Sequence, residues 1–369
     1  MSIFNLKNIN TSLLYSSICY LILTTVDSII YIQWINSINN YKWIISAILF
    51  PLLSSILLYM PVILYRLKGQ LFQENIDLSQ KKMFIIALFN SASSLLIPFC
   101  IEYINIFVWI IVRKMSILIT MIFSYFILEK RYLINHYISI GIILVGIGIG
   151  LLSQFKYNNS SNTSSPIAII GLFVVICLDS FSNIFKEKYL KNNKNINIFW
   201  MNSCITFWQL IIGIFTIPLI FIPIKSIYID PSDFGNYIIN SLNCQFIGIN
   251  NDRDDNCKLS LLFLCIYLII NSINISLIFL VIKHGSSVIY YLVYLLKTPL
   301  ISLLWYVLLK NNIVSANDTQ KFSMNLFDYI TLLFLIVGSF IYSLKQEYIK
   351  KKSELETLLL SMDNITPIV

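Results

Sequence analysis

The sequence predicts an all-α integral membrane protein with ten transmembrane helices, arranged as two inverted five-helix repeats. Of its 369 residues 57% are hydrophobic and only 12% are charged, and the mean hydropathy is +0.77. Ten apolar stretches are long enough, or nearly so, to cross a bilayer. A hairpin of two such stretches, residues 108–152, recurs close to the end of the chain. Composition therefore predicts the class, and internal repetition predicts the arrangement.

The repeated hairpin shows matching residues at matching spacing. In the first helix of the hairpin, Ser116 of the first copy matches Lys297 of the second copy. In the second helix, Gly146 matches Gly338. Only the connection differs, and it is longer in the second copy. Because each half contains five spans, an odd number, the second half must have the opposite orientation in the membrane. Inverted repeats are typical of transporters that bind substrate near the midplane.

The predicted spans divide the chain into two halves, two tails and a linker. The spans are 13–34, 43–65, 83–101, 107–128, 134–152, 167–185, 198–222, 259–282, 288–309 and 326–344. The expected domains are an N-terminal tail at 1–12, a first five-helix repeat at 13–152, a linker at 153–166, a second five-helix repeat at 167–344 and a C-terminal tail at 345–369.

Lysine and arginine are concentrated in the loops that share a side with both termini, which predicts that both termini are cytosolic. The net charge of +8 mostly records this topology and gives no argument for nucleic-acid binding. The linker and the long loop at 223–258 then lie on the non-cytosolic side.

Three features of the tails and loops predict covalent modification or sorting. The linker offers glycosylation acceptors at Asn158, Asn159 and Asn162, although an asparagine-rich flexible linker explains them equally well. In the long loop, Cys244 and Cys257 are expected to form a disulfide, because that compartment is oxidising. The C-terminal tail carries Glu354 before Leu358 and Leu359, a pattern similar to a vacuolar sorting signal; an amphipathic helix end is the alternative.

Polar and charged residues within the spans predict a wet substrate cavity, since hydrocarbon cannot satisfy them. Three cations, Arg113, Lys114 and Lys297, are the most notable of these. The expected cavity residues are Asp27, Ser28, Asn90, Arg113, Lys114, Asp179, Asn183, Gln209, Asn274, Lys297 and Thr298. Near the cytosolic end of the sixth span, Lys186 and Glu187 are expected to form a gate or an ion pair. Asp27, Asp179 and Glu187 are the candidate proton-coupling or ion-pairing carboxylates.

No enzyme site can be assembled from the sequence, and neither a metal nor another cofactor is expected. Asn251, Asp252 and Asp255 match a magnesium-diphosphate motif of intramembrane prenyltransferases, but they lie in a loop without a second aspartate motif. A lipid-modifying enzyme therefore ranks last among the functions considered.

Several stretches resemble the chloroquine-resistance-transporter family of the drug/metabolite transporter superfamily, and the resemblance covers about residues 13–344. They are Phe181-Ser182-Asn183-Ile184-Phe185-Lys186-Glu187, Asn202 with Phe207-Trp208-Gln209-Leu210, Ser116-Ile117-Leu118-Ile119 with the following Phe126–Tyr132, and the cysteine-bearing loop. The resemblance implies the ten-helix fold of that superfamily and a vacuolar or lysosome-like membrane. It also implies export of amino acids, peptides or organic cations from an acidic lumen, driven by protons or membrane potential.

The sequence differs from that family at four cavity positions. Asn90 and Asn274 stand where relatives carry acidic residues, and Lys114 and Lys297 stand where relatives carry glutamine. A more positive cavity repels dications, so small peptides, zwitterions or anions are expected as cargo in preference to chloroquine-like drugs. An organic-phosphate or nucleotide-sugar antiporter is the alternative, because intramembrane cations can clamp phosphate. The partners expected are a small-molecule substrate, a coupling proton or the membrane potential, and the lipid bilayer, with the protein as a monomer.

Overall fold

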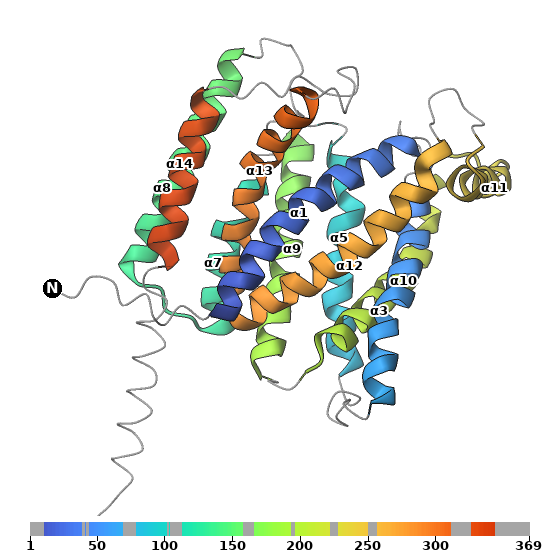
Figure 1. Ribbon diagram of the computed structural model, residues 1–369, viewed down its shortest axis with the longest axis horizontal. Helices are drawn as coiled ribbons and strands as arrows, with labels where there is room; N and C mark the ends of the chain where they lie inside the picture. Colours follow the sequence, from blue (N-terminus) through green and yellow to red (C-terminus); the bar gives the residue numbers. More distant parts are fainter. Residues whose placement is uncertain are drawn as a thin grey trace, which may run out of the picture.

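A computed structural model gives the arrangement of the helices (Figure 1). It describes residues 11–38, 41, 44–68, 79–101, 103, 113–157, 166–192, 196–221, 228–249, 257–310 and 326–343. Every regular element in these ranges is helical. The glycosylation acceptors Asn158, Asn159 and Asn162, the sorting residues Glu354, Leu358 and Leu359, and the loop residues Asn251, Asp252 and Asp255 lie outside them.

The described part of each of the ten predicted spans contains a helix. The longer elements are α1 (Thr11–Ser37), α3 (Phe50–Leu67), α5 (Gln80–Ile101), α7 (Ser116–Leu128), α8 (Ile134–Tyr157), α9 (Pro166–Asn192), α10 (Ile198–Phe215), α11 (Phe234–Leu242), α12 (Ser260–His284), α13 (Ser287–Lys310) and α14 (Leu326–Ser343). Short helical turns are η3 (Ile45–Leu49), η4 (Ile217–Phe221), η5 (Asn243–Ile247) and η6 (Cys257–Leu259).

Among the described residues, five helices are long and apolar enough to cross a membrane, which indicates a multi-pass membrane protein. They are Thr11–Ser37, Ile45–Leu67, Pro166–Asn192, Ile198–Phe221 and Cys257–His284. Shorter apolar helices lie at Ser116–Leu128, Ile134–Ile149 and Ser287–Lys297.

Local signals explain where several helices begin or end. The Asn197 side chain caps α10 by accepting hydrogen bonds from the backbone N–H groups of Phe199 and Trp200, at 2.9 and 3.3 Å. Gly285 and Ser286 separate α12 from α13, and the Ser286 hydroxyl accepts from the Ile289 N–H at 3.2 Å. This two-residue connection holds α12 and α13 close together.

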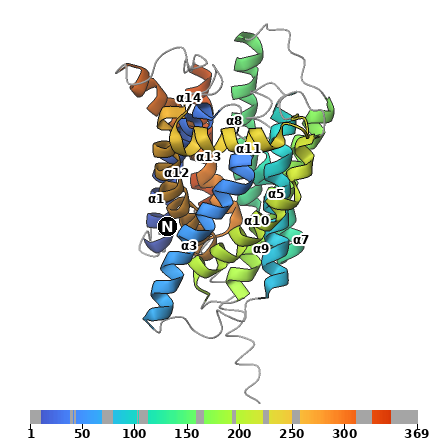
Figure 2. The same ribbon diagram turned by 90° about the vertical axis from the view of Figure 1, so that its right-hand side faces the viewer.

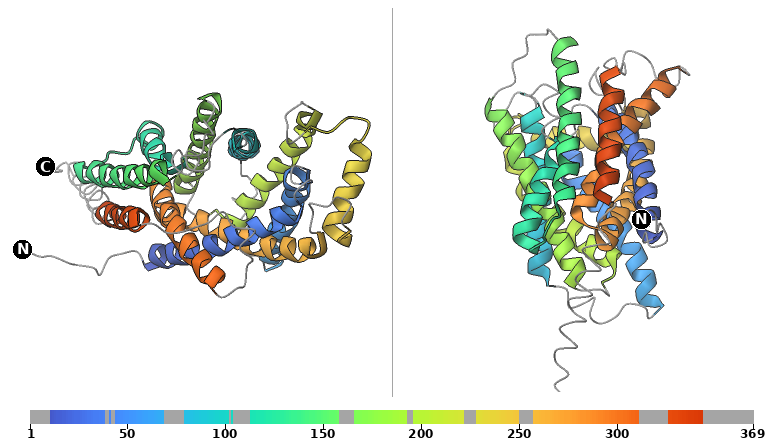
Figure 3. Two further views of the ribbon diagram at one scale, coloured as in Figure 1. Left: turned by 90° about the horizontal axis from the view of Figure 1, so that it is seen from above. Right: turned by 90° about the vertical axis from the view of Figure 1, so that its left-hand side faces the viewer.

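The helices form two layers that are closed at both ends by pairs of helices (Figure 3). One layer contains α7, α9 and α5, and the other contains α13, α1 and α12. Helices α8 and α14 pack on each other at one end, and α3 and α10 at the other. In each layer the central helix and its two neighbours come from different halves of the chain. Helix α1 of the first half packs on α12 and α13 of the second, and α9 of the second half packs on α5 and α7 of the first.

Helices α8 and α14, the second helices of the repeated hairpin, touch through equivalent residues. The Ser139 hydroxyl donates a hydrogen bond to the Gly338 carbonyl. At the equivalent position Thr331 donates to the Gly146 carbonyl, at 3.1 Å. The two glycines permit this approach, because a Cβ on either would lie 2.5 Å from a side-chain carbon of the opposite helix. Positions matched in sequence therefore make reciprocal contacts in space.

We expect Gly146→Leu to destabilise the protein strongly, because the added side chain would overlap Phe334 on α14. Overpacking of this kind costs about 1–3 kcal/mol. Gly141→Leu is the matched control on the same helix, since a Cβ at Gly141 meets nothing within 4 Å. The midpoint of thermal unfolding in detergent is the measurement, and equal midpoints for the two variants would contradict the proposed close packing.

The loop at 223–258 contains a helix that we did not predict. Helix α11 runs roughly at right angles to the neighbouring α3 and α10 (Figure 2). Phe234, Tyr237 and Ile238 recur at helical spacing and pack against a cluster around Trp34. This helical spacing of apolar residues is present in the sequence, but it extends over only a short stretch.

Cys244 and Cys257 are close enough for the disulfide that we expected, with their sulfur atoms 2.07 Å apart. Both are buried against α1 and α12, in the same cluster as Trp34. The bond anchors the long loop to the membrane domain.

We expect Cys244→Ser with Cys257→Ser to lose about 3 kcal/mol of stability, the usual effect of a disulfide that closes a loop of this length. Thermal unfolding with and without a reductant measures the loss. The control is Cys265→Ser, an exposed free cysteine on α12. A wild-type midpoint that reductant leaves unchanged would argue against the bond.

Candidate functional site

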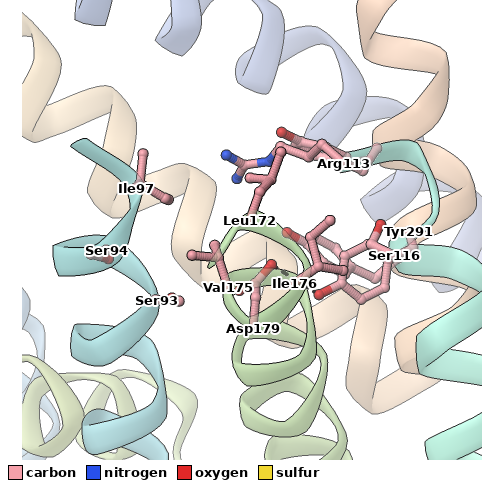
Figure 4. A pocket seen from close by; sticks show the side chains of 12 residues that line it. Ser93, Ser94, Ile97, Arg113, Ser116, Leu172, Val175, Ile176, Asp179 and Tyr291 are labelled. Carbon is pink, nitrogen blue, oxygen red and sulfur yellow. Dashed lines mark hydrogen bonds between the residues drawn. The ribbon is translucent and has the colours of Figure 1, made fainter. Parts of the chain in front are cut away.

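A cavity of about 100 Å³ opens between the two layers (Figure 4). Its walls come from α5, the start of α7, α9 and α13. The lining residues are Ser93, Ser94, Ile97, Arg113, Ser116, Leu172, Val175, Ile176, Asp179, Tyr290, Tyr291 and Tyr294. Both halves of the chain contribute, so the cavity lies where a substrate between inverted repeats is expected.

The cavity contains one positive and one negative side chain. In Figure 4 Arg113 extends over the cavity and Asp179 lies on α9 beneath it. The two are within electrostatic range of each other. Asn183 donates to the Tyr291 hydroxyl at 2.8 Å, and this hydroxyl donates to the Asp179 carboxylate at 3.0 Å. The Asp179 carboxylate is therefore held in place from α13, with its charge towards the cavity.

The ring of Tyr294 lies beside two cations. The Arg113 guanidinium carbon is 5.9 Å from the ring centroid, and the Lys297 ammonium nitrogen is 5.1 Å from it. Both distances are within the range of cation–π attraction. Tyr294 thus links an arginine of the first half to a lysine of the second half at the cavity wall.

Two other predicted cavity residues meet elsewhere, between α1 and α12. The Asn274 amide donates to one carboxylate oxygen of Asp27 at 3.4 Å. Both side chains are buried, at 5% and 9% exposure. Ser28 instead donates to the Thr24 carbonyl within its own helix, at 2.9 Å.

Glu187 is the centre of a buried ion network that joins three segments. Its carboxylate forms salt bridges with Lys130 of the α7–α8 connection and with Lys191, the latter at 2.6 Å. It also accepts from the Ser287 backbone N–H at 2.9 Å. Burial lowers the pKa of Lys130 to about 8, while the negative charge of Glu187 opposes that shift. Lys130 therefore remains mostly charged at neutral pH.

Lys186, which we expected to pair with Glu187, turns the other way. Its ammonium group donates to the amide oxygens of Asn183 at 3.2 Å and Asn90 at 3.4 Å. Adjacent residues on a helix point in different directions, so Lys186 faces α5 while Glu187 faces the α7–α8 connection. Asn90 thus holds Lys186.

The structure brings some of the predicted cavity residues together and separates others. Arg113 and Asp179 line the cavity, and Asn183 and Lys297 reach it through Tyr291 and Tyr294. Lys114 and Gln209 are half-buried outside its lining, and the Thr298 side chain lies outside the described residues. Asp27 and Asn274 form the separate pair described above.

Sequence reasoning missed the tyrosines Tyr290, Tyr291 and Tyr294. A signal existed, because three tyrosines within five residues of an otherwise apolar span place several hydroxyl groups at membrane depth. The tyrosine side chain is largely apolar, so a criterion based on charged and amide side chains does not identify these three residues.

Sequence comparison places this chain among known membrane transporters. The sequence profile of the CRT-like family, described as chloroquine-resistance transporter-like, matches residues 13–342. A protein of Plasmodium chabaudi is 25% identical over 358 residues, which cover 93% of this chain and 81% of that relative.

Other relatives bear the name chloroquine resistance transporter. The Plasmodium vivax transporter is 26% identical to this chain, and the match covers 66% of this chain and 58% of that relative. That of Plasmodium falciparum is 23% identical and covers 91% and 80% respectively. A solved crystal structure superposes with a TM-score of 0.54 at 11% identity, covering 90% of this chain and 98% of the other, and so supports the fold alone.

Proposed function

This chain belongs to the chloroquine-resistance-transporter-like family of membrane transporters, and from that membership we propose that it exports small zwitterionic solutes from a vacuole- or lysosome-like lumen to the cytosol. Amino acids and short peptides are the cargo class. Transport is secondary active, driven by protons or membrane potential, and proceeds by alternating access of two inverted five-helix halves. Both termini are cytosolic.

The packing of the helices supports the inverted repeat. In chain order, helices α1, α3, α5, α7 and α8 of the first half correspond to α9, α10, α12, α13 and α14 of the second. The α1–α12 contact therefore corresponds to the α9–α5 contact, and the α1–α13 contact to the α9–α7 contact. Each of these four contacts is extensive. The α8–α14 and α3–α10 pairs map onto themselves. Such a pattern is what two halves related by a pseudo-two-fold axis produce.

The observation that carries the cargo class is the presence of Arg113 and Asp179 in one small cavity. An α-carboxylate matches the guanidinium, and an α-ammonium group matches the carboxylate. The hydroxyl groups of Ser93, Ser94 and Ser116 add neutral hydrogen-bonding partners. A zwitterion satisfies both charges at once, whereas a simple cation or anion leaves one uncompensated.

The size and charge of the cavity argue against quinoline-like drugs as the preferred cargo. Its volume of about 100 Å³ is well below the roughly 300–1,000 Å³ of pockets that hold drug-sized ligands. Arg113 and Lys297, which both lie near the Tyr294 ring, also repel a dication.

These same two cations favour one second candidate, an organic-phosphate antiporter. Paired basic side chains bind phosphate through charge-assisted hydrogen bonds. The negative charge of Asp179 would repel a phosphate ligand, so we rank the organic-phosphate antiporter below the zwitterion exporter.

Uptake into proteoliposomes tests the proposal. The assay compares labelled amino acids and dipeptides with phosphorylated sugars, with and without an imposed pH gradient or membrane potential. We expect gradient-dependent flux of a zwitterion that is lost in Asp179→Asn. Strict exchange of phosphorylated compounds that ignores pH would select the antiporter, and faster flux of a dicationic quinoline than of any zwitterion would reject the cargo class.

A further inference from the structure

Asp27 and Asp179 occupy equivalent positions in the two halves. Helices α1 and α9, the first of each half, contain the tripeptides Val26-Asp27-Ser28 and Leu178-Asp179-Ser180. With these aspartates matched, Tyr20 falls on Leu172, and both are almost fully buried. Ser16 and Ala168, and Thr24 and Ile176, are further buried pairs in the same register. The repeated hairpin is thus not the only duplicated stretch.

The helices packed against these aspartates match as well. Helix α5 contains Asn90-Ser91 and helix α12 contains Asn271-Ser272, and this match places Ser93 opposite Asn274. The register is the same as that between Ser116 and Lys297 in the hairpin. Ser93 lines the cavity with Asp179, and Asn274 donates to Asp27. Each aspartate therefore has an equivalent polar neighbour.

A cation from the fourth helix of the opposite half, α7 or α13, accompanies each aspartate. Arg113, one turn before Ser116 at the start of α7, is in electrostatic range of Asp179. Lys297 of α13, the residue equivalent to Ser116, is in electrostatic range of Asp27. The two cations lie beside the same Tyr294 ring. The Asp27 group thus repeats the chemistry of the cavity on the other layer.

Two buried oxygens of the Asp27 group have no hydrogen-bond partner in the described structure. They are the second carboxylate oxygen of Asp27 and the amide oxygen of Asn274. Within the described residues Lys297 forms no salt bridge with Asp27. Burying polar oxygens without hydrogen-bond partners is energetically costly. Two unsatisfied acceptors call for a donor with more than one hydrogen, such as an ammonium group.

We propose that Asp27, Asn274 and Lys297 form a second binding site for a small zwitterion, equivalent by internal repetition to the Asp179 cavity. The ligand ammonium group binds the unsatisfied oxygens of Asp27 and Asn274, and its carboxylate binds Lys297. Inverted halves exchange conformations during alternating access, so this site opens as the Asp179 cavity closes. The cargo class rests on the proposed function, whereas the second site is an additional claim.

Equilibrium binding of radiolabelled L-alanine to the purified full-length protein tests the site. We expect Asp179→Asn to keep measurable binding, since the Asp27 site remains, and Asp27→Asn in that background to abolish it. Lys297→Gln in the same Asp179→Asn background is expected to weaken alanine binding roughly a hundredfold, the usual effect of removing one buried charged partner. Lys258→Gln, at an exposed lysine of the long loop, is the control. Size-exclusion profiles verify that each variant is folded, and the lysine variant answers the question if the Asp27 variant does not fold.

Loss of all alanine binding in Asp179→Asn alone would overturn the second site, as would no binding by the wild type. Binding that survives both the double aspartate variant and Lys297→Gln would overturn it too. These outcomes differ from failure of the proposed function, which proteoliposome flux decides. If the protein transports amino acids but alanine binding depends on Asp179 alone, only the second site is rejected. If alanine binds at both sites but no flux is seen, only the exporter function is rejected.

Discussion

Arg113→Ala is expected to weaken the apparent affinity for a transported amino acid about a hundredfold. The guanidinium is the only cation among the described residues that line the cavity, and it faces Asp179. Truncating a buried charged partner costs about 2–5 kcal/mol, and each 1.4 kcal/mol is tenfold in affinity. The concentration dependence of uptake into proteoliposomes gives the value.

The matched control is Arg131→Ala, which removes an exposed cation from the α7–α8 connection. Arg113→Lys separates charge from geometry: it is expected to recover only part of the affinity, because lysine cannot bind a carboxylate in the bidentate manner of arginine. Uptake by Arg113→Ala at wild-type affinity would place the substrate elsewhere.

Glu187→Gln is expected to lose about 3 kcal/mol of stability. The Glu187 side chain is 0% exposed and offsets the charges of Lys130 and Lys191. Without its charge, Lys130 is left partly buried and unpaired. Lys191 is largely solvated, so most of the loss is assigned to Lys130. The midpoint of thermal unfolding in detergent measures it.

Glu129→Gln, an exposed carboxylate next to Lys130 in sequence, is the control for this prediction. Lys130→Met is expected to rescue part of the loss when it is combined with Glu187→Gln, because the unpaired charge is then removed. Additive effects of the two changes would show that the ion pair does not hold the α7–α8 connection against α9.

Much of the fold could be predicted, because a bilayer imposes length and polarity on every span. The described part of each of the ten predicted ranges falls on a helix, and the matched Gly146 of α8 and Gly338 of α14 each pack closely against the opposite helix. Helix α11 escaped prediction, since its nine residues lie outside the membrane where that constraint does not apply.

The candidate site was less predictable, because charge identifies a candidate residue but not its neighbour. Lys186 and Glu187 are adjacent in sequence yet bind different segments. Asp27 and Asp179 were both expected in one cavity, but they lie in different layers. Which helix packs on which depends on the three-dimensional pairing of halves, and no local pattern reports it.

The exchange of first helices between the layers has a consequence for biosynthesis. Helix α1 leaves the ribosome before the other helices, but its main packing partners, α12 and α13, are made late, followed only by α14 among the described helices. The bond between Asn274 and Asp27 spans 247 residues of sequence. Until α12 is inserted, the Asp27 carboxylate lacks its amide partner inside the lipid, where an unpaired charge is costly. The first half therefore cannot mature as an independent unit, and damage late in the chain leaves its first helix exposed to quality control.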